Sequence, residues 1–165
     1  MKGFPALPDV VLGPLASRAE ADWYKAPPGK WSPAQIVQHL ALSLETSAHT
    51  FEERQARAPM RRRPRGLLQY VGYFLVLRLG WSPLQGDAPA AVRPADRPNP
   101  RGVEQQFRDA VARWRALERR LLPARAADLF VKHPALGDLT IPEWRRFHVW
   151  HCAHHAQQIR ARLAP

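Results

Sequence analysis

The chain has 165 residues, of which 45% are hydrophobic and 24% charged, which is typical of one globular domain spanning residues 1–165 and excludes a wholly disordered, fibrous or membrane-embedded chain. The net charge of +11, from 25 basic and 14 acidic residues, taken alone favours an anionic partner, but the arginine bias, with 17 prolines, is as typical of genome-wide codon preference. The single cysteine, Cys152, cannot form an internal disulfide and no signal-peptide pattern begins the chain, so we expect a cytoplasmic protein.

The first half of the chain is predicted to hold three helices. The first covers about residues 9–24. The second begins after Ser32, which can cap it, with Pro33 at the first helical position and Gln35 completing a capping box. Apolar residues at spacings of three and four extend this helix to about residue 57. The third helix, at residues 65–81, is mostly apolar.

The second half is predicted to hold two more helices. An amphipathic pattern covers residues 103–122. The last helix begins after Thr140, where Glu143 completes a second capping box, and it continues almost to the C-terminus. We expect the proline-rich segment 82–101 and residues 129–139 to be irregular connections, because no alternating strand pattern is found. The sequence thus predicts an all-α helical bundle, in which long connections allow helices to run parallel.

The longest apolar stretch, residues 67–77, contains Gln69 and is followed by Arg78. It is shorter than the ~20 residues that cross a bilayer, so no membrane partner is expected. The stretch could mediate self-association into a homodimer, but burial within the bundle explains it adequately.

Four of the seven histidines crowd into the last predicted helix: His148, His151, His154 and His155. A spacing of four residues puts His151 and His155 on one helix face, about 40° apart, so both imidazoles can reach a single ion. His154 points to the other side of His151 and is the poorer partner. Because neighbouring cationic imidazoles repel each other, a helix gains nothing from clustering them, and metal binding and a structural role are about equally favoured for the pair.

A third ligand has to come from elsewhere in the chain. His39 is the best candidate, because it lies inside a capped helix beside the apolar stripe, next to a polar strip that could line a pocket. His49 lies further along, nearer the predicted helix end. Two histidines from one helix and one from another is a familiar way to build a three-nitrogen metal site in a bundle.

Two segments resemble a known family. Residues 133–140 read His-Pro-Ala-Leu-Gly-Asp-Leu-Thr ahead of the histidine-rich helix, and residues 31–40 read Trp-Ser-Pro-Ala-Gln-Ile-Val-Gln-His-Leu. Both resemble the DinB/YfiT-like family of metal-dependent enzymes, and more narrowly a branch with an H-P-x-x-G-x-L-T segment before the last helix. The resemblance covers the chain end to end. It implies a four-helix bundle, with an additional short helix and long connecting loops, that holds a divalent metal through His39, His151 and His155.

Three neutral imidazoles leave the charge of the ion uncompensated, so a bound water would be acidified or a thiol would bind as thiolate. Zinc or nickel is the expected metal. The last helix has no H-E-x-x-H arrangement, which disfavours a peptidase. Relatives in the resembling family include thiol-cofactor transferases and isomerases, so the resemblance implies activation of a low-molecular-weight thiol or of water, for transfer to or hydrolysis of a small-molecule substrate.

Several further side chains keep two interpretations. Gln158, one turn beyond His155, could bind the cofactor or orient a bound water, or it could be an interior amide. Cys152 is favoured as a small buried hydrophobe. His133, before a proline, is favoured as a hydrogen bonder that fastens its loop, and whether His148, His154 or His133 assists the site stays open.

The alternative function is that of a non-catalytic arginine-rich binding protein for nucleic acid or another acidic macromolecule. Its candidate surface is the run Arg61, Arg62, Arg63 and Arg65 between two predicted helices. This run lacks interleaved aromatic residues and any known nucleic-acid-reading motif. A solvated junction is therefore favoured, and no specific nucleic-acid partner is expected.

Overall fold

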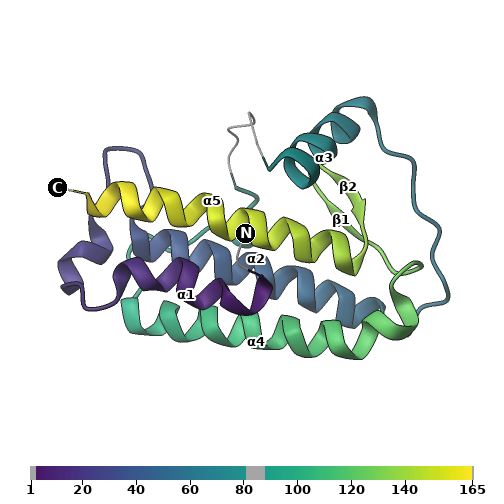
Figure 1. The fold of residues 1–165 in the computed structure, drawn as a ribbon, viewed down its shortest axis with the longest axis horizontal. Coiled ribbons are helices and arrows are strands. Elements are labelled where there is room, and N and C mark those ends of the chain that lie inside the picture. The colour runs from purple at the N-terminus through teal and green to yellow at the C-terminus, as the bar shows by residue number, and fades with distance from the viewer. Residues whose placement is uncertain (1–2, 81–87, 165) are drawn as a thin grey trace.

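A computed structural model describes residues 3–80 and 88–164, which are mostly helical (Figure 1). The α-helices are α1 (Leu7–Leu12), α2 (Pro33–Arg54), α3 (Leu67–Leu79), α4 (Pro100–Arg125) and α5 (Ile141–Leu163). Short 3-10 turns occur at Phe4–Ala6, Gly13–Leu15, Glu20–Tyr24 and Ala90–Val92, and two short strands, β1 (Val131–His133) and β2 (Gly137–Leu139), precede α5.

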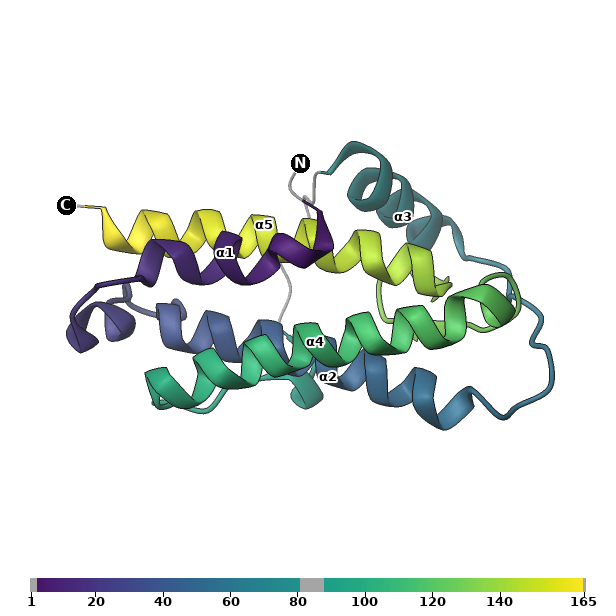
Figure 2. The same cartoon turned by 60° about the horizontal axis from the view of Figure 1, so that its bottom comes forward.

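The long helices form two layers. Figures 1 and 2 show α2 and α4 side by side and running in the same direction, with α5 antiparallel to them and α1 lying alongside α5. The parallel pair is connected through α3 and the segment that follows it, which confirms that the long connections let helices run parallel. α3 and the β-hairpin lie at the end of the molecule where α5 begins.

The two capping boxes are formed as expected, and they fix where α2 and α5 begin. The Ser32 side chain accepts from the Gln35 N–H while the Gln35 side chain accepts from the Ser32 N–H, and Thr140 and Glu143 make the same reciprocal pair. α4 begins earlier than expected, because Asn99 caps it by accepting from the Gly102 N–H at 3.0 Å.

Two predicted elements are wrong. The opening helix ends at Leu12 instead of continuing to residue 24, because Pro14 has no N–H to donate and Ser17 adopts a positive φ of 63°. Residues 131–139 form an antiparallel hairpin, in which Val131 pairs with Leu139 and His133 with Gly137, instead of an irregular connection. Each strand is only three residues long, too short for an alternating pattern to be recognised.

The segment 82–101 was expected to be irregular. Residues 82–87 lie outside the described residues. From residue 88 to Asn99 the chain is irregular apart from the turn at Ala90–Val92, and Pro100 already belongs to α4.

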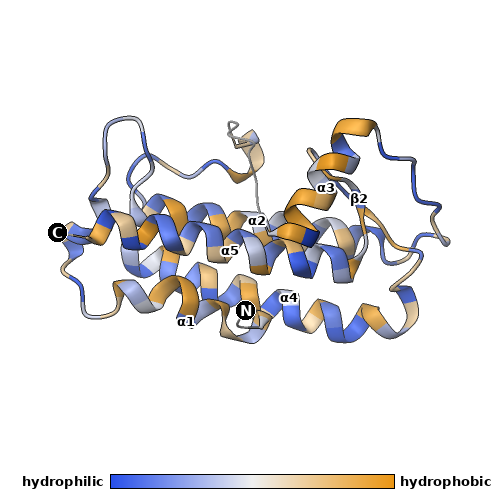
Figure 3. Ribbon diagram, turned by 45° about the horizontal axis from the view of Figure 1, so that its top comes forward, coloured by the Kyte–Doolittle hydropathy of each residue, from blue (hydrophilic) through white to orange (hydrophobic). Residues whose placement is uncertain are grey.

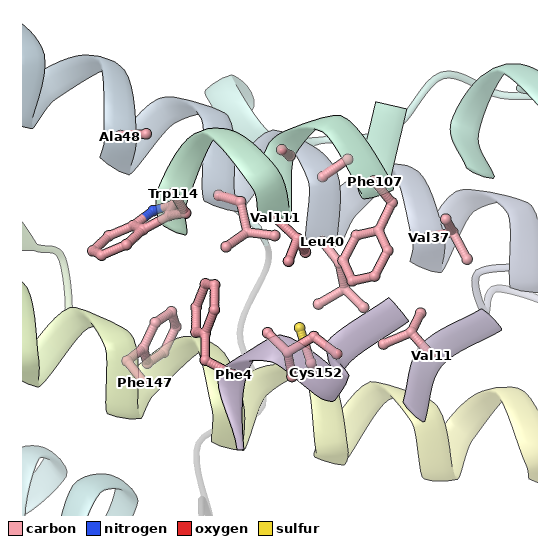
Figure 4. Packing of buried hydrophobic residues seen from close by; sticks show 14 of the residues in the cluster. Phe4, Val11, Val37, Leu40, Ala48, Phe107, Val111, Trp114, Phe147 and Cys152 are labelled. Carbon is pink, nitrogen blue, oxygen red and sulfur yellow. The ribbon is translucent and has the colours of Figure 1, made fainter. Parts of the chain in front are cut away.

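The core lies between the two layers and includes residues from the N-terminal segment (Figure 4). Phe4 and Val11 pack between α5 and α4. Trp114 of α4 lies beside Phe4 and is fully buried. The Trp114 ring contacts Phe4 and Phe51 at centroid distances of 5.9 Å, and its Nε1 donates to Ser47 Oγ at 2.9 Å. This packing fixes α2 against α4 and α5, and it therefore fixes the histidines on α2 and α5 relative to each other.

α3 departs from the expectation that its apolar residues are buried within the bundle. Gly72 and Val76 are its buried residues, whereas both leucines at its start are exposed, Leu67 at 79% and Leu68 at 85%. Figure 3 shows this helix as largely hydrophobic at the edge of the molecule. Within the described ranges, no helix is long and apolar enough to cross a bilayer.

Candidate metal centre

Three histidines from two antiparallel helices meet at one point. His39 Nε2 on α2 lies 3.2 Å from His151 Nε2 on α5, and His155 Nε2 lies 3.1 Å from the same His151 atom. The three ligand atoms all lie within 4.8 Å of one another. His39 and His151 are 6% and 9% exposed. The structure therefore brings together the three residues that the sequence pattern singled out.

A backbone carbonyl orients His39. Its Nδ1 lies 2.8 Å from the carbonyl oxygen of Val92. A carbonyl oxygen can only accept, so Nδ1 of the neutral ring carries the hydrogen, and the Nε2 lone pair faces the other two histidines. Such hydrogen bonds to the far nitrogen are how proteins usually set the orientation of metal-binding imidazoles.

The segment that supplies the Val92 carbonyl is itself held against α2. The Gln35 side chain donates to the carbonyl oxygens of Ala95 and Asp96, at 3.2 and 3.1 Å, and the Ala95 N–H donates to Gln38 Oε1 at 2.8 Å. Both glutamines lie within one turn of His39. One helix thus supplies His39 and also the two glutamines that hold the hydrogen-bond partner of His39 in place.

Gln158 orients His155. The Gln158 Oε1 atom accepts from His155 Nδ1 at 2.9 Å, and the Gln158 Nε2 atom donates to His154 Nε2 at 3.1 Å. The Nε2 lone pair of His155 consequently faces His151 and His39. The expected contact between Gln158 and a cofactor stays a prediction, because the amide group lies against the far side of His155.

Aromatic packing holds His151. Its ring stacks on Phe147 at a centroid distance of 5.0 Å and on Trp150 at 6.2 Å. Its Nδ1 is buried, and within the part of the chain that the structure describes it has no hydrogen-bond partner. Unlike His39 and His155, His151 therefore depends on packing for its orientation.

Burial keeps all three imidazoles neutral near pH 7. Loss of solvation lowers the pKa of His39, and it lowers the pKa of His151 well below its ordinary value. The pKa of His155 falls to about 3, first through burial and then through repulsion from His39. Neutral rings are the form that binds metal ions.

The three neutral histidines have too few ring hydrogens to make a hydrogen bond at each contact between their rings. His39 and His155 carry their hydrogens on Nδ1, so at most one hydrogen, on His151 Nε2, is available for two nitrogen–nitrogen contacts. One divalent ion would satisfy all three lone pairs. Imidazole nitrogens about 2.0–2.1 Å from a tetrahedral zinc ion lie roughly 3.4 Å from one another, close to the 3.2 and 3.1 Å that separate His151 Nε2 from the other two nitrogens.

The other histidines have structural partners. His148 is buried, its Nε2 lies 2.9 Å from Ser47 Oγ, and burial lowers its pKa to about 3. His133 Nδ1 accepts from the Ala135 N–H at 3.2 Å, as expected of a residue that fastens its loop, and burial lowers its pKa to about 4. His49 is exposed and lies 3.4 Å from Glu53. None of these three contacts the cluster through a described hydrogen bond.

Cys152 and the arginine run also have positions that the structure explains. Cys152 is buried, and burial raises the pKa of its thiol. Arg62 pairs with Glu143 at 2.6 Å, and the Arg63 Nε atom donates to Asp138 at 2.9 Å. Much of the run thus attaches the segment before α3 to the β-hairpin and to the start of α5, so the expectation of a solvated junction holds only in part.

The sequence reasoning missed the groups that orient the ligands. The Val92 carbonyl is a backbone atom in an irregular segment, so no side-chain pattern could identify it. The stacking of Phe147 on His151 could have been anticipated, because residues four apart are neighbours on a helix surface. The contact of Trp150 could not, because adjacent residues of a helix point in different directions.

Comparison with known proteins places the chain in a family. The curated proteins and the solved structures gave no match. A family model described as "Protein of unknown function (DUF1569)" matches residues 15–162, which include all three clustered histidines, Gln158, the helices α2 to α4 and all but the last residue of α5. The chain therefore belongs to the DUF1569 family.

Proposed function

We propose that the protein is a metal-dependent enzyme whose resident divalent ion is held by His39, His151 and His155. The observation that carries this proposal is the pair of short nitrogen–nitrogen contacts, 3.2 and 3.1 Å, for which the three neutral rings supply at most one hydrogen. A cluster of histidines kept only for structure would be expected to pair each ring nitrogen with a donor or an acceptor of its own.

The proposed fold is a DinB/YfiT-like four-helix bundle formed by α1, α2, α4 and α5, with α3 as the additional helix. The proposal rests on the two segments that carry the resemblance, of which residues 31–40 include the capped start of α2 and residues 133–140 end at the Thr140 cap of α5. Bundles of this kind commonly project metal ligands inward from facing helices.

The donor set favours an ion that accepts imidazole, with zinc or nickel first. When bound, such an ion supplies a Lewis acid that lowers the pKa of a water molecule or of a small thiol that binds to it. Among the described residues, no carboxylate belongs to the three-histidine cluster. The cluster adds no negative charge, so anionic donors such as a thiolate are favoured.

The residues around the cluster would limit water access and keep the ligands in place. The Trp31 ring lies 4.8 Å from the His39 ring, and Phe147 stacks on His151. These apolar walls lower the local dielectric, which strengthens electrostatic interactions with a bound substrate. We propose a small-molecule substrate and a transfer or hydrolysis reaction.

Metal content of matched variants tests the ligand assignment. Wild type that has been dialysed against zinc or nickel is expected to bind about one ion per chain. The variants His39→Ala, His151→Ala and His155→Ala, treated in the same way, are each expected to bind none. His49→Ala is the control, because this exposed histidine lies on the same helix as His39. Circular dichroism shows whether each variant is folded. Retention of the ion by all three folded ligand variants would overturn the assignment.

Thiol binding separates the two proposed reactions. Cobalt-loaded protein is titrated with glutathione and other small thiols in a Cys152→Ser background, so that the chain's own thiol contributes no signal. A strong sulfur-to-metal absorption band would support thiol activation. An unchanged spectrum, with cobalt still bound, would leave water as the activated group and hydrolysis as the reaction.

A further inference from the structure

The largest exposed hydrophobic side chains all belong to α3. Among the described residues these are Leu67, Leu68, Tyr70, Val71, Phe74 and Leu79. Figure 3 shows α3 as largely hydrophobic against a more mixed surface. A contiguous apolar patch of several hundred Å² on a monomer usually marks an interaction site. The remaining question is which partner covers it.

Contacts on the inner face hold α3 in one orientation. A Cβ at Gly72 would lie 3.2 Å from the Ala135 carbonyl oxygen, so the helix backbone approaches the hairpin closely. Tyr73 donates to Glu143 at 2.8 Å, and the Arg65 guanidinium lies 4.0 Å from the centre of the Tyr73 ring. These contacts use the inner face, so the outer apolar face cannot rotate inward and is presented preformed.

The outer face suits pairing with an identical face. Leu67, Val71 and Phe74 recur at spacings of three and four, so they lie along one side of the helix, and Arg78 follows in the same row. In an antiparallel pair about a two-fold axis, Val71 meets Phe74 of the other copy, which places a small side chain beside a large one. The apolar stem of Arg78 then covers Leu67 of the other copy.

Antiparallel pairing also separates the charges. With a rise of 1.5 Å per residue and the axis near the helix centre, the two Arg78 side chains start about 16 Å apart. This separation exceeds the Debye length of roughly 8 Å at physiological salt, so their repulsion is screened. Arg78 is the one ionic residue within α3, and the face therefore has no other charge to desolvate.

An anionic lipid surface is the competing partner, and the charges disfavour it. Helices that bind membrane surfaces carry a basic face exposed beside their apolar face. Here Arg62 and Arg63 are paired with Glu143 and Asp138, and Arg65 donates to the Leu136 and Asp138 carbonyls. Three of the nearest basic residues are thus already occupied by the protein itself.

We propose that the outer face of α3 is the interface through which two copies of this chain form a symmetric dimer. The six apolar side chains are 45–85% exposed and spread over the outward half of α3, so Leu67, Val71 and Phe74 form the centre of the contact and the other three its borders, an area at the lower end of what specific interfaces bury. This inference does not depend on the metal, since the interface uses none of the three clustered histidines.

Analytical ultracentrifugation of the full chain tests the proposal. We expect a species of twice the 18.8 kDa chain mass at micromolar concentration. Because each copy carries a net charge of +11, the dimer should become tighter as salt increases. Binding to anionic vesicles would instead become weaker with salt.

Matched charge variants locate the interface. Val71→Asp places a carboxylate in the centre of the proposed contact and should weaken dimerisation at least about 100-fold. Ala116→Asp introduces the same charge on the exposed side of α4 and should leave the dimer intact. A chain that is monomeric up to about 100 μM, a dimer unaffected by Val71→Asp, or a monomer that binds anionic vesicles would each overturn the proposal.

Discussion

The Nε2 atoms of His39 and His151 lie 3.2 Å apart although 112 residues separate them in the chain. The two residues come from helices that run in opposite directions and are fixed against each other by the core around Trp114. His155, one turn after His151, completes the cluster at 3.1 Å. The three-histidine cluster therefore depends on tertiary packing, and the orientation of each ring depends on a different kind of support.

Gln158 is expected to tune metal affinity without touching the ion. Gln158→Ala removes the acceptor for His155 Nδ1, so the ring loses its fixed orientation. We expect a 10–100-fold loss of zinc or nickel affinity, to about the extent known for such supporting hydrogen bonds. Competition with a chromophoric chelator measures it. Gln157→Ala, at the exposed neighbouring position, is the control. Equal affinities for the two variants would show that Gln158 has no orienting role.

Ser47 is expected to be essential to the core between α2, α4 and α5. Its hydroxyl accepts from Trp114 Nε1 and lies 2.9 Å from His148 Nε2. Ser47→Ala leaves both buried nitrogens without a partner, and we expect the free energy of unfolding to fall by about 2–4 kcal/mol. In Ser43→Ala the lost hydroxyl is one that, among the described residues, bonds to the His39 carbonyl alone, so the loss should stay below about 1 kcal/mol. Urea unfolding of both variants decides this, and similar losses would contradict it.

Acid should destabilise the protein through its buried histidines. Burial lowers the pKa of His148 to about 3 and that of His133 to about 4, from an ordinary value of 6.5. At pH values between these lowered pKa values and 6.5, the unfolded chain binds more protons than the folded chain. The free energy of unfolding therefore falls as the pH falls below 6.5.

The check on this pH dependence is urea unfolding of the metal-free protein at pH 7 and pH 5. His148→Gln keeps a donor for Ser47 and removes one titrating ring, so its stability should fall less between the two pH values than that of wild type. His49→Gln, at an exposed position, should behave like wild type. If His148→Gln and wild type lose the same stability, buried His148 does not contribute to the acid sensitivity.

DNA binding is expected to be weak, independent of sequence and steeply reduced by salt. The arginines at residues 61–65 lack a reading motif, and Arg63 is already paired with Asp138. Fluorescence anisotropy with unrelated duplexes at two salt concentrations measures this. Tight binding to one sequence that disappears when Arg61, Arg62 and Arg63 are neutralised would favour the alternative function.

Local signals explain what the sequence could predict. The capping residues Ser32 and Thr140 define helix starts through contacts within four residues, so both starts were identified correctly. The spacing of His151 and His155 is also local, since it places two rings on one turn. His39 could be chosen over His49 because the apolar periodicity of α2 already indicates which of the two faces inward.

Long-range packing explains what the sequence could not predict. The Val92 carbonyl reaches His39 only because Gln38 and its neighbours hold an irregular segment against α2. The hairpin before α5 is too short for a periodic signal. The exposure of Phe74 and its neighbours on α3 was missed because a mostly apolar stretch indicates that a helix is covered and does not show by which molecule.

The most direct test of the three-histidine centre is X-ray absorption spectroscopy of wild-type protein that has been dialysed against zinc or nickel, with elemental analysis of the same sample. We expect about one ion per chain, with imidazole scattering from three histidines and no sulfur ligand from the buried Cys152. A metal content at background level, or a bound ion whose ligands are not imidazoles, would contradict the assignment of His39, His151 and His155.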